Sequence, residues 1–319
     1  MHDLYTHGTG TLRVPWLVRG LRTVDRLRAG NRVYVTAFQL FGDGSRPPTY
    51  SAELEAAFFR PIRLTNGTFK TTSAGRLGDL NRLVEQHLPV RRPLSIKDVA
   101  VSSGVSTAEW SERLRDRGIE HRMTATDLTI SALLVSITDQ LRILFDSKGA
   151  ILQIDMAGYP VYPRISRRLN RWLLGLPSRL AGRFAARQLA ACIRPRSDWT
   201  PSSVQQLELV TPRLRELGIE VKEEDLSDPD TSDERWDVIR AANILNRAYF
   251  APHVLSQMLE RLTASLDVGG VLAVCRTELD GRNHGSVWRL QPGRSLDLLG
   301  RVGQGSEIED LVRGRSFAP

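Results

Sequence analysis

One stretch, residues 95–104, constrains the fold of this chain more than any other. Its sequence, Ser-Ile-Lys-Asp-Val-Ala-Val-Ser-Ser-Gly, places the β-prone residues Ile96, Val99 and Val101 ahead of a Ser-Ser-Gly break. A helical pattern follows at once, so the stretch predicts a strand, a tight turn and a helix. Gly104 can adopt backbone angles that a side chain disfavours, which lets a ligand approach the turn closely. The stretch therefore predicts a nucleotide-binding opening of a βαβ unit.

The residues after the turn predict the rest of that unit. Ser106 and Glu109 have the spacing of a capping box for the new helix. Residues 120–126 then predict a second strand that ends at Asp127, where a carboxylate would meet ribose hydroxyls. The alternative is an ordinary βαβ unit in which Asp127 caps the next helix.

The same residues resemble the first motif of the class I S-adenosylmethionine-dependent methyltransferases. That motif is an acidic residue on strand 1 followed by a glycine-rich turn, acid-x-Gly-x-Gly-x-Gly, and this chain has at those positions Asp98, Ala100, Ser102 and Gly104. Two of the three glycines are replaced, by Ala and Ser, the smallest replacements. The resemblance covers residues 93–158 and 204–315. It implies an α/β fold, a Rossmann-like αβα sandwich with a mostly parallel sheet, and S-adenosylmethionine as the cofactor.

Two later stretches also resemble elements of that family. Residues 218–226 predict a strand that ends in acids, and the family often has an acidic residue near this point that contacts the adenine amino group. The resemblance implies that role for Asp225, with a solvated loop carboxylate as the alternative. The cofactor-binding residues expected in total are Asp98, Ala100, Ser102, Gly104, Asp127 and Asp225.

Residues 236–246 resemble the fourth strand of the family and the polar segment that faces the transferred methyl group. Substrate contacts are expected in and just after this segment, from Asn243, Asn246 and Tyr249, with packing or surface roles as the alternative for each. The Asn/Asp-Pro-Pro-Tyr/Phe signature of methyltransferases that act on adenine or glutamine amino groups is absent, which counts against those substrates. No catalytic residue is assigned, because methyl transfer from a sulfonium depends mainly on positioning.

Composition limits the remaining possibilities. The chain has 319 residues with 41% hydrophobic content, enough for one large core, or for one core with an appended subdomain. Its two cysteines, Cys192 and Cys275, suggest neither metal ligands nor disulfides. No run of about 18 apolar residues and no signal-like start occurs, so a cytoplasmic protein is expected. The net charge of +8 suggests an anionic partner.

The predicted organisation is a mostly helical N-terminal extension, residues 1–92, before a methyltransferase-like core, residues 93–319. Residues 127–136 are expected to begin a short helix or loop. Residues 141–155 contain two β-prone runs around Asp-Ser-Lys-Gly, which predicts a hairpin. Because a hairpin is not part of the minimal core of the family, it marks an insertion, which continues into residues 160–196.

Residues 160–196 contain nine arginines and no acidic residue, with apolar side chains at helical spacing. Three interpretations remain open. The segment is a lid packed on its own domain, a basic amphipathic element that lies on the inner face of an anionic membrane, or a surface for nucleic acid phosphates.

The sequence therefore predicts an S-adenosylmethionine-dependent methyltransferase acting on a small or amphiphilic, lipid-like acceptor. The alternatives are a non-catalytic binding module with a methyltransferase fold, a nicotinamide-dependent oxidoreductase and an RNA methyltransferase. The oxidoreductase alternative is disfavoured, because the Gly-x-Gly-x-x-Gly turn of nicotinamide-binding domains is missing.

Overall fold

The structure, a computed structural model, consists of two compact units. The larger unit comprises Thr72–Ile130 and Leu209–Pro319, and the smaller unit comprises Met1–Thr71 and Ser131–Glu208. Each unit is described by itself below. The residues described are 35–42, 51–64, 70, 75–138, 140–156, 158–162, 204–228, 234–278, 280–313 and 315–317.

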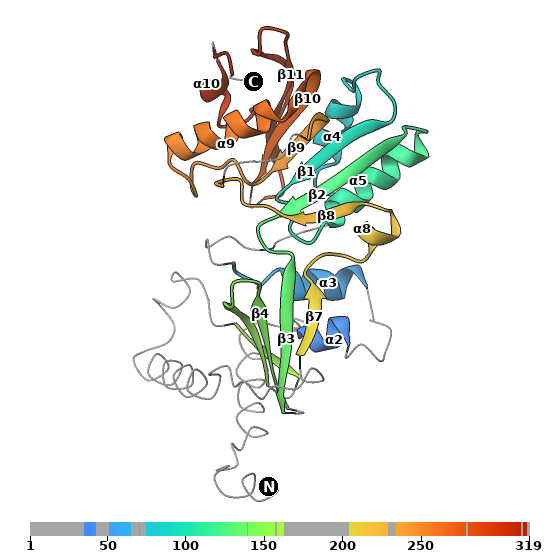
Figure 1. The fold of residues 1–319 in the computed structure, drawn as a ribbon, viewed down its shortest axis with the longest axis vertical. Coiled ribbons are helices and arrows are strands. Elements are labelled where there is room, and N and C mark those ends of the chain that lie inside the picture. Colours follow the sequence, from blue (N-terminus) through green and yellow to red (C-terminus); the bar gives the residue numbers. More distant parts are fainter. Residues whose placement is uncertain are drawn as a thin grey trace, which may run out of the picture. The chain divides into compact units, whose positions relative to one another are not determined.

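The larger unit is built on a seven-stranded sheet with the order β12-β11-β10-β9-β1-β2-β8 (Figure 1). The five strands from β8 to β10 are parallel, and β11 and β12 are antiparallel additions. The mostly parallel Rossmann-like sheet is therefore confirmed. The strands are β1 (Leu94–Val99), β2 (His121–Asp127), β8 (Glu220–Glu223), β9 (Trp236–Ala242), β10 (Leu266–Thr277), β11 (Asn283–Leu290) and β12 (Leu296–Val302).

Helices cover both faces of this sheet (Figure 1). Alternate residues of β1 show the division, because Leu94 and Ile96 lie in one apolar cluster and Val99 lies in the other. The first cluster includes residues of α4 (Gly78–Glu85), α5 (Val105–Asp116) and α8 (Arg213–Glu216). The second includes residues of α9 (Pro252–Ala264) and α10 (Glu309–Val312). The result is an αβα sandwich, as predicted.

Helix α9 shows how the sequence determines one of these layers. Pro252 stands at the first helical position, where its missing N–H removes no hydrogen bond. The buried residues Leu255, Met258, Leu259 and Leu262 then recur at the spacing of one helical face. The sequence pattern therefore accounts for this helix.

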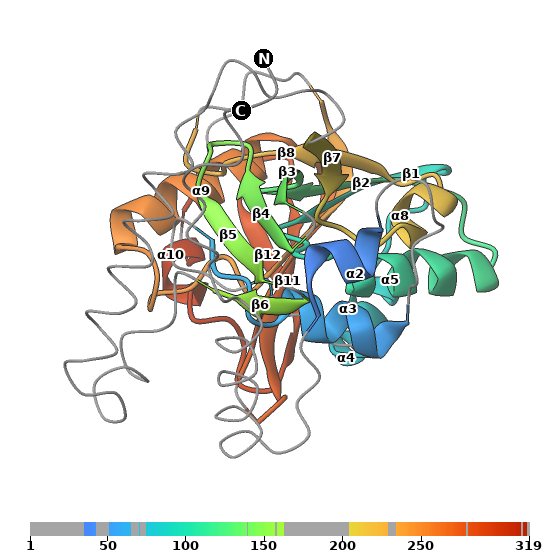
Figure 2. The same ribbon diagram turned by 90° about the horizontal axis from the view of Figure 1, so that it is seen from below.

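The smaller unit holds an antiparallel five-stranded sheet with the order β6-β5-β4-β3-β7, and Figure 2 shows β4, β5 and β6 beside one another. In Gln153 the amide group accepts a hydrogen bond from Ala37 N (2.7 Å) and donates one to Val35 O (3.1 Å), which ties helix α2 to β5. The elements are α2 (Ala37–Phe41), α3 (Ala52–Phe59), β3 (Ser131–Thr138), β4 (Leu141–Asp146), β5 (Ile151–Met156), β6 (Tyr159–Val161) and β7 (Val204–Glu208).

The predicted hairpin is present as β4 and β5. Its turn is closed by Asp146, whose Oδ1 accepts from Lys148 N (3.1 Å) and Ala150 N (2.6 Å). The helix or loop expected within residues 127–136 is wrong, because Ser131–Thr138 forms strand β3. Its position between β4 and β7 supplies backbone partners on both edges, and such long-range pairing overrides a weak local pattern.

The division into units differs from the predicted boundaries. Helix α4, which the prediction placed in the N-terminal extension, belongs to the larger unit and packs near β10, β11 and β12. The inserted part begins at Ser131 and shares its unit with the N-terminal segment. Residues 163–196 of the predicted basic insertion lie outside the described residues. None of the helices in the described ranges has the length and apolar content that crossing a membrane requires.

Candidate functional site

The predicted binding residues follow the carboxyl ends of four neighbouring strands. Because β8, β2, β1 and β9 are parallel neighbours in that order, their carboxyl ends share one edge of the sheet. The strand order reverses between β1 and β9, and ligands of open α/β sheets bind at such a switch point. Residues at this edge are, in sheet order, Asp225, Asp127, the turn 100–104 and Asn243.

The turn after β1 has positive φ angles at three alternate residues. The φ angles are +58° at Ala100, +60° at Ser102 and +77° at Gly104, the three positions at which the motif has glycine. A left-handed conformation costs a residue with a side chain about 1–2 kcal/mol. Such strain persists where the surrounding structure imposes it, and it is frequent at functional sites.

Gly104 is required by packing as well as by its backbone angle. A Cβ atom at this position would lie 2.4 Å from Leu214 Cδ1 on α8. The Gly104 carbonyl also accepts the hydrogen bond from Ala108 N that opens α5. The predicted capping box of this helix is wrong: Gly104 is the N-cap, and no side chain caps the helix. The Glu109 carboxylate instead accepts from Gly75 N (2.9 and 3.1 Å).

Asp127 at the end of β2 supports the turn directly. Its Oδ2 accepts a hydrogen bond from Ser102 N at 2.7 Å, and its Oδ1 accepts one from Thr129 N at 3.3 Å. The residue is 6% exposed. Asp127 therefore ties the end of β2 to the turn after β1.

Asp98, the acid of the predicted motif, forms a buried ion pair with Arg240 on β9. Arg240 Nε donates to Asp98 Oδ1 at 2.9 Å, and Arg240 Nη2 donates to Asp98 Oδ2. Thr107 Oγ1 donates to the same Oδ2 at 2.6 Å. Both carboxylate oxygens therefore have partners inside the protein, and Asp98 ties β1 to β9 and α5.

Sequence reasoning missed Arg240. Its guanidinium stacks on the Trp110 ring at 4.4 Å from the centroid, and its Nη1 donates to Asn81 Oδ1 at 2.6 Å. The residue is 1% exposed. The signal was an arginine in the centre of the apolar strand Trp-Asp-Val-Ile-Arg-Ala-Ala, because a buried cation requires an acidic or aromatic partner.

The three predicted substrate residues differ in their surroundings. Asn243 has a φ of +62°, accepts a hydrogen bond at Oδ1 from Thr277 N (2.7 Å), and has a buried Nδ2 with no hydrogen-bond partner in the described part of the chain. Asn246 is buried, and its Oδ1 accepts from Ala248 N at 2.7 Å. Tyr249 is 53% exposed. Asn243 is therefore the one of the three with a donor still to be satisfied.

Further buried polar atoms near this edge lack hydrogen-bond partners within the described ranges. They include Ser103 Oγ in the turn and Thr126 Oγ1 at the end of β2, on residues that are 0% and 2% exposed. Most buried polar atoms in proteins are hydrogen-bonded, so a group of exceptions calls for a ligand or ordered water. With Asn243 Nδ2, these atoms offer hydrogen-bonding groups at the switch point.

Neither a metal centre nor a thiol nucleophile is supported by the described part. It contains no group of three or more His, Cys, Asp or Glu residues that could hold a metal ion. Cys275 on β10 is 3% exposed. Burial raises the pKa of its thiol to about 12, so it remains protonated at neutral pH.

Comparison with known proteins found no matching family model and no matching curated protein sequence. Similar solved structures include a TehB-like SAM-dependent methyltransferase from Corynebacterium glutamicum, at 14% identity over 61% of this chain and 60% of that chain, with a TM-score of 0.28. The N-methyltransferase NodS from Bradyrhizobium japonicum, solved with S-adenosyl-L-homocysteine, has 12% identity over 62% of this chain and 60% of its own, with a TM-score of 0.28.

The glycopeptide N-methyltransferase MtfA has 11% identity over 63% of this chain and 53% of its own, with a TM-score of 0.30. The chain thus spans 60% or less of the length of these three proteins. At such identities and TM-scores, the similarity assigns neither an activity nor a substrate to the chain.

Proposed function

We propose that the larger unit binds S-adenosylmethionine at the carboxyl ends of β8, β2, β1 and β9 and transfers its methyl group to a small or amphiphilic acceptor. The observation that carries this proposal is the turn after β1. Its backbone has positive φ at Ala100, Ser102 and Gly104, although two of these residues carry side chains. A simple connection between β1 and α5 does not require this backbone strain, and strain of this kind is concentrated at functional sites.

The residues present fit this cofactor by chemistry. The turn 100–104 offers backbone and small side chains for close approach, and carboxylates follow the two neighbouring strands at Asp127 and Asp225. Asp127 would accept hydrogen bonds from the ribose hydroxyls, and Asp225 from the exocyclic amino group of adenine. The cofactor would supply an electrophilic methyl group on a sulfonium.

The chain's own contribution to the reaction would be orientation. Methyl transfer requires the acceptor atom and the methyl group to be in line, and holding two reactants in that geometry provides much of the rate. Asn243 Nδ2 is the donor best suited to orient an acceptor, because it is buried at the switch point without a hydrogen-bond partner in the described part. No general base is assigned.

Calorimetric titration of the full chain with S-adenosylmethionine and S-adenosylhomocysteine tests this proposal. Asp127→Ala should weaken binding by about 10- to 100-fold, because a charge-assisted hydrogen bond is worth about 1.5–3 kcal/mol. NAD serves as the negative control. Binding of NAD without binding of either sulfur ligand would replace the methyltransferase by a nicotinamide-dependent enzyme.

A second candidate is a binding module without turnover. It is favoured by the replacement of two of the three turn glycines, by Ala100 and Ser102. The module predicts binding of S-adenosylhomocysteine without methyl transfer. Incubation with labelled S-adenosylmethionine and cell extracts, compared with the same extracts without the chain, separates the two, because only the enzyme adds a labelled product.

We also propose that the acceptor is presented at an anionic membrane surface, on the cytoplasmic side. The support is the sequence of residues 160–196, nine arginines without an acid. Liposome sedimentation should show binding to anionic but not neutral vesicles, and the binding should fall as salt screens the charge. A variant with Arg164→Glu, Arg168→Glu and Arg171→Glu should lose it. Equal partitioning of both proteins would leave a soluble acceptor.

A further inference from the structure

We propose that Lys97 and Arg261 are positioning residues that together hold Asp225 in place to recognise the amino group of a purine base. This inference rests on the proposed function, because it concerns the adenine end of the same ligand. Asp225 lies in the connection between β8 and β9, which has no regular secondary structure between Glu224 and Arg235 in its described residues. Such a connection places a side chain reproducibly only if other contacts fix it.

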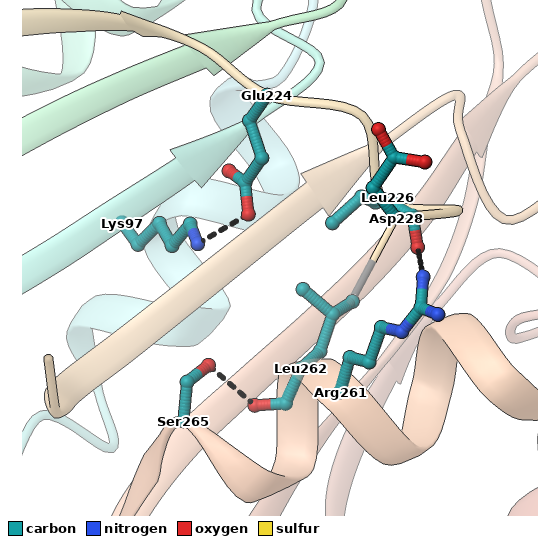
Figure 3. A pocket seen from close by; sticks show the side chains of 7 residues that line it. All are labelled: Lys97, Glu224, Leu226, Asp228, Arg261, Leu262 and Ser265. Atoms are coloured by element: carbon teal, nitrogen blue, oxygen red, sulfur yellow. Dashed lines mark hydrogen bonds and ion pairs between the residues drawn. The ribbon is translucent and has the colours of Figure 1, made fainter. Parts of the chain in front are cut away.

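Lys97 fixes the residue before Asp225. It stands in the middle of β1, is 5% exposed, and its Nζ lies 2.7 Å from Glu224 Oε1 (Figure 3). The ammonium group also lies 6.0 Å from the centroid of the Trp236 ring, at the start of β9. A buried ammonium requires an acidic partner. Lys97 therefore joins both ends of the connection to the central strand.

Arg261 fixes the residue after Asp225. Its Nη1, on helix α9, donates a hydrogen bond to Leu226 O (Figure 3). Leu226 is 8% exposed and belongs to the apolar cluster that includes residues of α9. The two neighbours of Asp225 in the sequence are thus both held, Glu224 by Lys97 on β1 and Leu226 by Arg261 on α9.

The space around these two cations is too small to be a ligand site itself. The cavity lined by Lys97, Glu224 and Arg261 has a volume of about 10 Å³, which is about the minimum for one water molecule. Glu224 Oε2 is buried and has no hydrogen-bond partner in the described part, so one water there would complete the network. The geometry points to a support for the connection.

The contacts of Asp225 leave one oxygen for a ligand. Its Oδ1 accepts hydrogen bonds from Ser227 N (2.9 Å) and from Ser227 Oγ, which orients the carboxylate. Among the described residues, none donates to Oδ2. A carboxylate oxygen accepts and never donates, so it favours a purine with an exocyclic amino group over one with a carbonyl at that position.

The test compares two ligands that differ only in that amino group, S-adenosylhomocysteine and its analogue in which hydrogen replaces the amino group at C6, by calorimetric titration of the full chain. The wild type should prefer the adenosyl form by about 10- to 100-fold. Lys97→Met and Arg261→Met should each lower this preference to less than about 3-fold. Matched controls are Lys222→Met, which loses an exposed pair with Glu234, and Arg315→Met, which loses a pair with Glu260; both should keep the preference.

A merely structural role would give a different result. If Lys97→Met and Arg261→Met weakened both ligands by the same factor and kept the preference, the inference would be overturned. Asp225→Asn should abolish the preference, and adding Lys97→Met to it should change the preference no further. Should Lys97→Met fail to fold, Lys97→Arg and Arg261→Lys, which retain the charge, provide graded versions of the same comparison.

The wild type alone separates this inference from the proposed function. Binding of both ligands with equal affinity would overturn the role of Asp225 and its supports, while the cofactor site would stand. Binding of neither ligand would overturn both.

Discussion

Replacing Arg240 by Met should be among the most destabilising single changes in the larger unit. Arg240 and Asp98 are 1% and 2% exposed, and the substitution removes both hydrogen bonds of the guanidinium to the carboxylate. Asp98 would keep only the hydrogen bond from Thr107 Oγ1. Removing one partner of a buried ion pair costs about 3–5 kcal/mol, because the remaining buried charge loses its ion-pair partner. Met fills part of the volume over Trp110, so lost packing adds little.

Urea unfolding at pH 7 measures this cost, and a double-mutant cycle with Asp98→Asn isolates the pair. The variant with both substitutions should be more stable than Arg240→Met alone, because it leaves no buried charge. The control is Arg282→Met, which breaks an exposed pair with Asp280 and should cost less than about 1 kcal/mol. A cost below 1 kcal/mol for Arg240→Met, or additive effects in the cycle, would refute the buried pair.

Three further changes test the turn and the sheet. Gly104→Ala should cost about 2–5 kcal/mol in unfolding free energy, from the left-handed backbone and the contact with Leu214. Measured in a chain that already carries Leu214→Ala, the same substitution should cost less, because the contact is gone. An unchanged stability for Gly104→Ala would contradict the φ of +77°. Ala100→Gly should instead stabilise the folded chain by about 0.5–1 kcal/mol. Glycine relieves about 1–2 kcal/mol of backbone strain, which exceeds the cost of the greater conformational entropy that glycine gives the unfolded chain. A lower midpoint of thermal unfolding would contradict this prediction. Burial lowers the pKa of His121 below its ordinary value of 6.5. The stability that neutral His121 contributes is therefore complete above pH 6.5. It is lost as the pH falls below 6.5, because the unfolded chain then takes up a proton more readily than the folded chain. The unfolding free energy of His121→Gln should therefore fall less than that of the wild type between pH 7.5 and 5. Parallel pH profiles of the two proteins would exclude this role of His121.

The elements of the larger unit were largely predictable because their signals are local. The spacing of Leu255, Met258 and Leu262 marks α9, and the break after Val101 marks the turn into α5. The order of strands along the chain then fixes the shared edge, since parallel neighbours present their carboxyl ends together. The positions of Asp127 and Asp225 at strand ends follow from this rule alone.

What could not be predicted depends on contacts between distant residues. Arg240 meets Asp98 from a position 142 residues away, and no local pattern encodes such a pair. The same holds for Lys97 and Glu224, 127 residues apart. Strand β3 was missed because its partners on both edges come from other segments. The positive φ of Ala100 could not be predicted from the sequence, because alanine rarely adopts that conformation.

Calorimetric titration of the full chain with S-adenosylhomocysteine tests the central claim most directly. We predict binding with one site per chain, and an increase in thermal stability at saturating ligand, about 2.7 kcal/mol at a concentration 100 times the dissociation constant. The affinity should fall by about 10- to 100-fold in Asp225→Ala. Absence of both binding heat and thermal stabilisation, with a folded protein and millimolar ligand, would contradict a cofactor site at these strand ends.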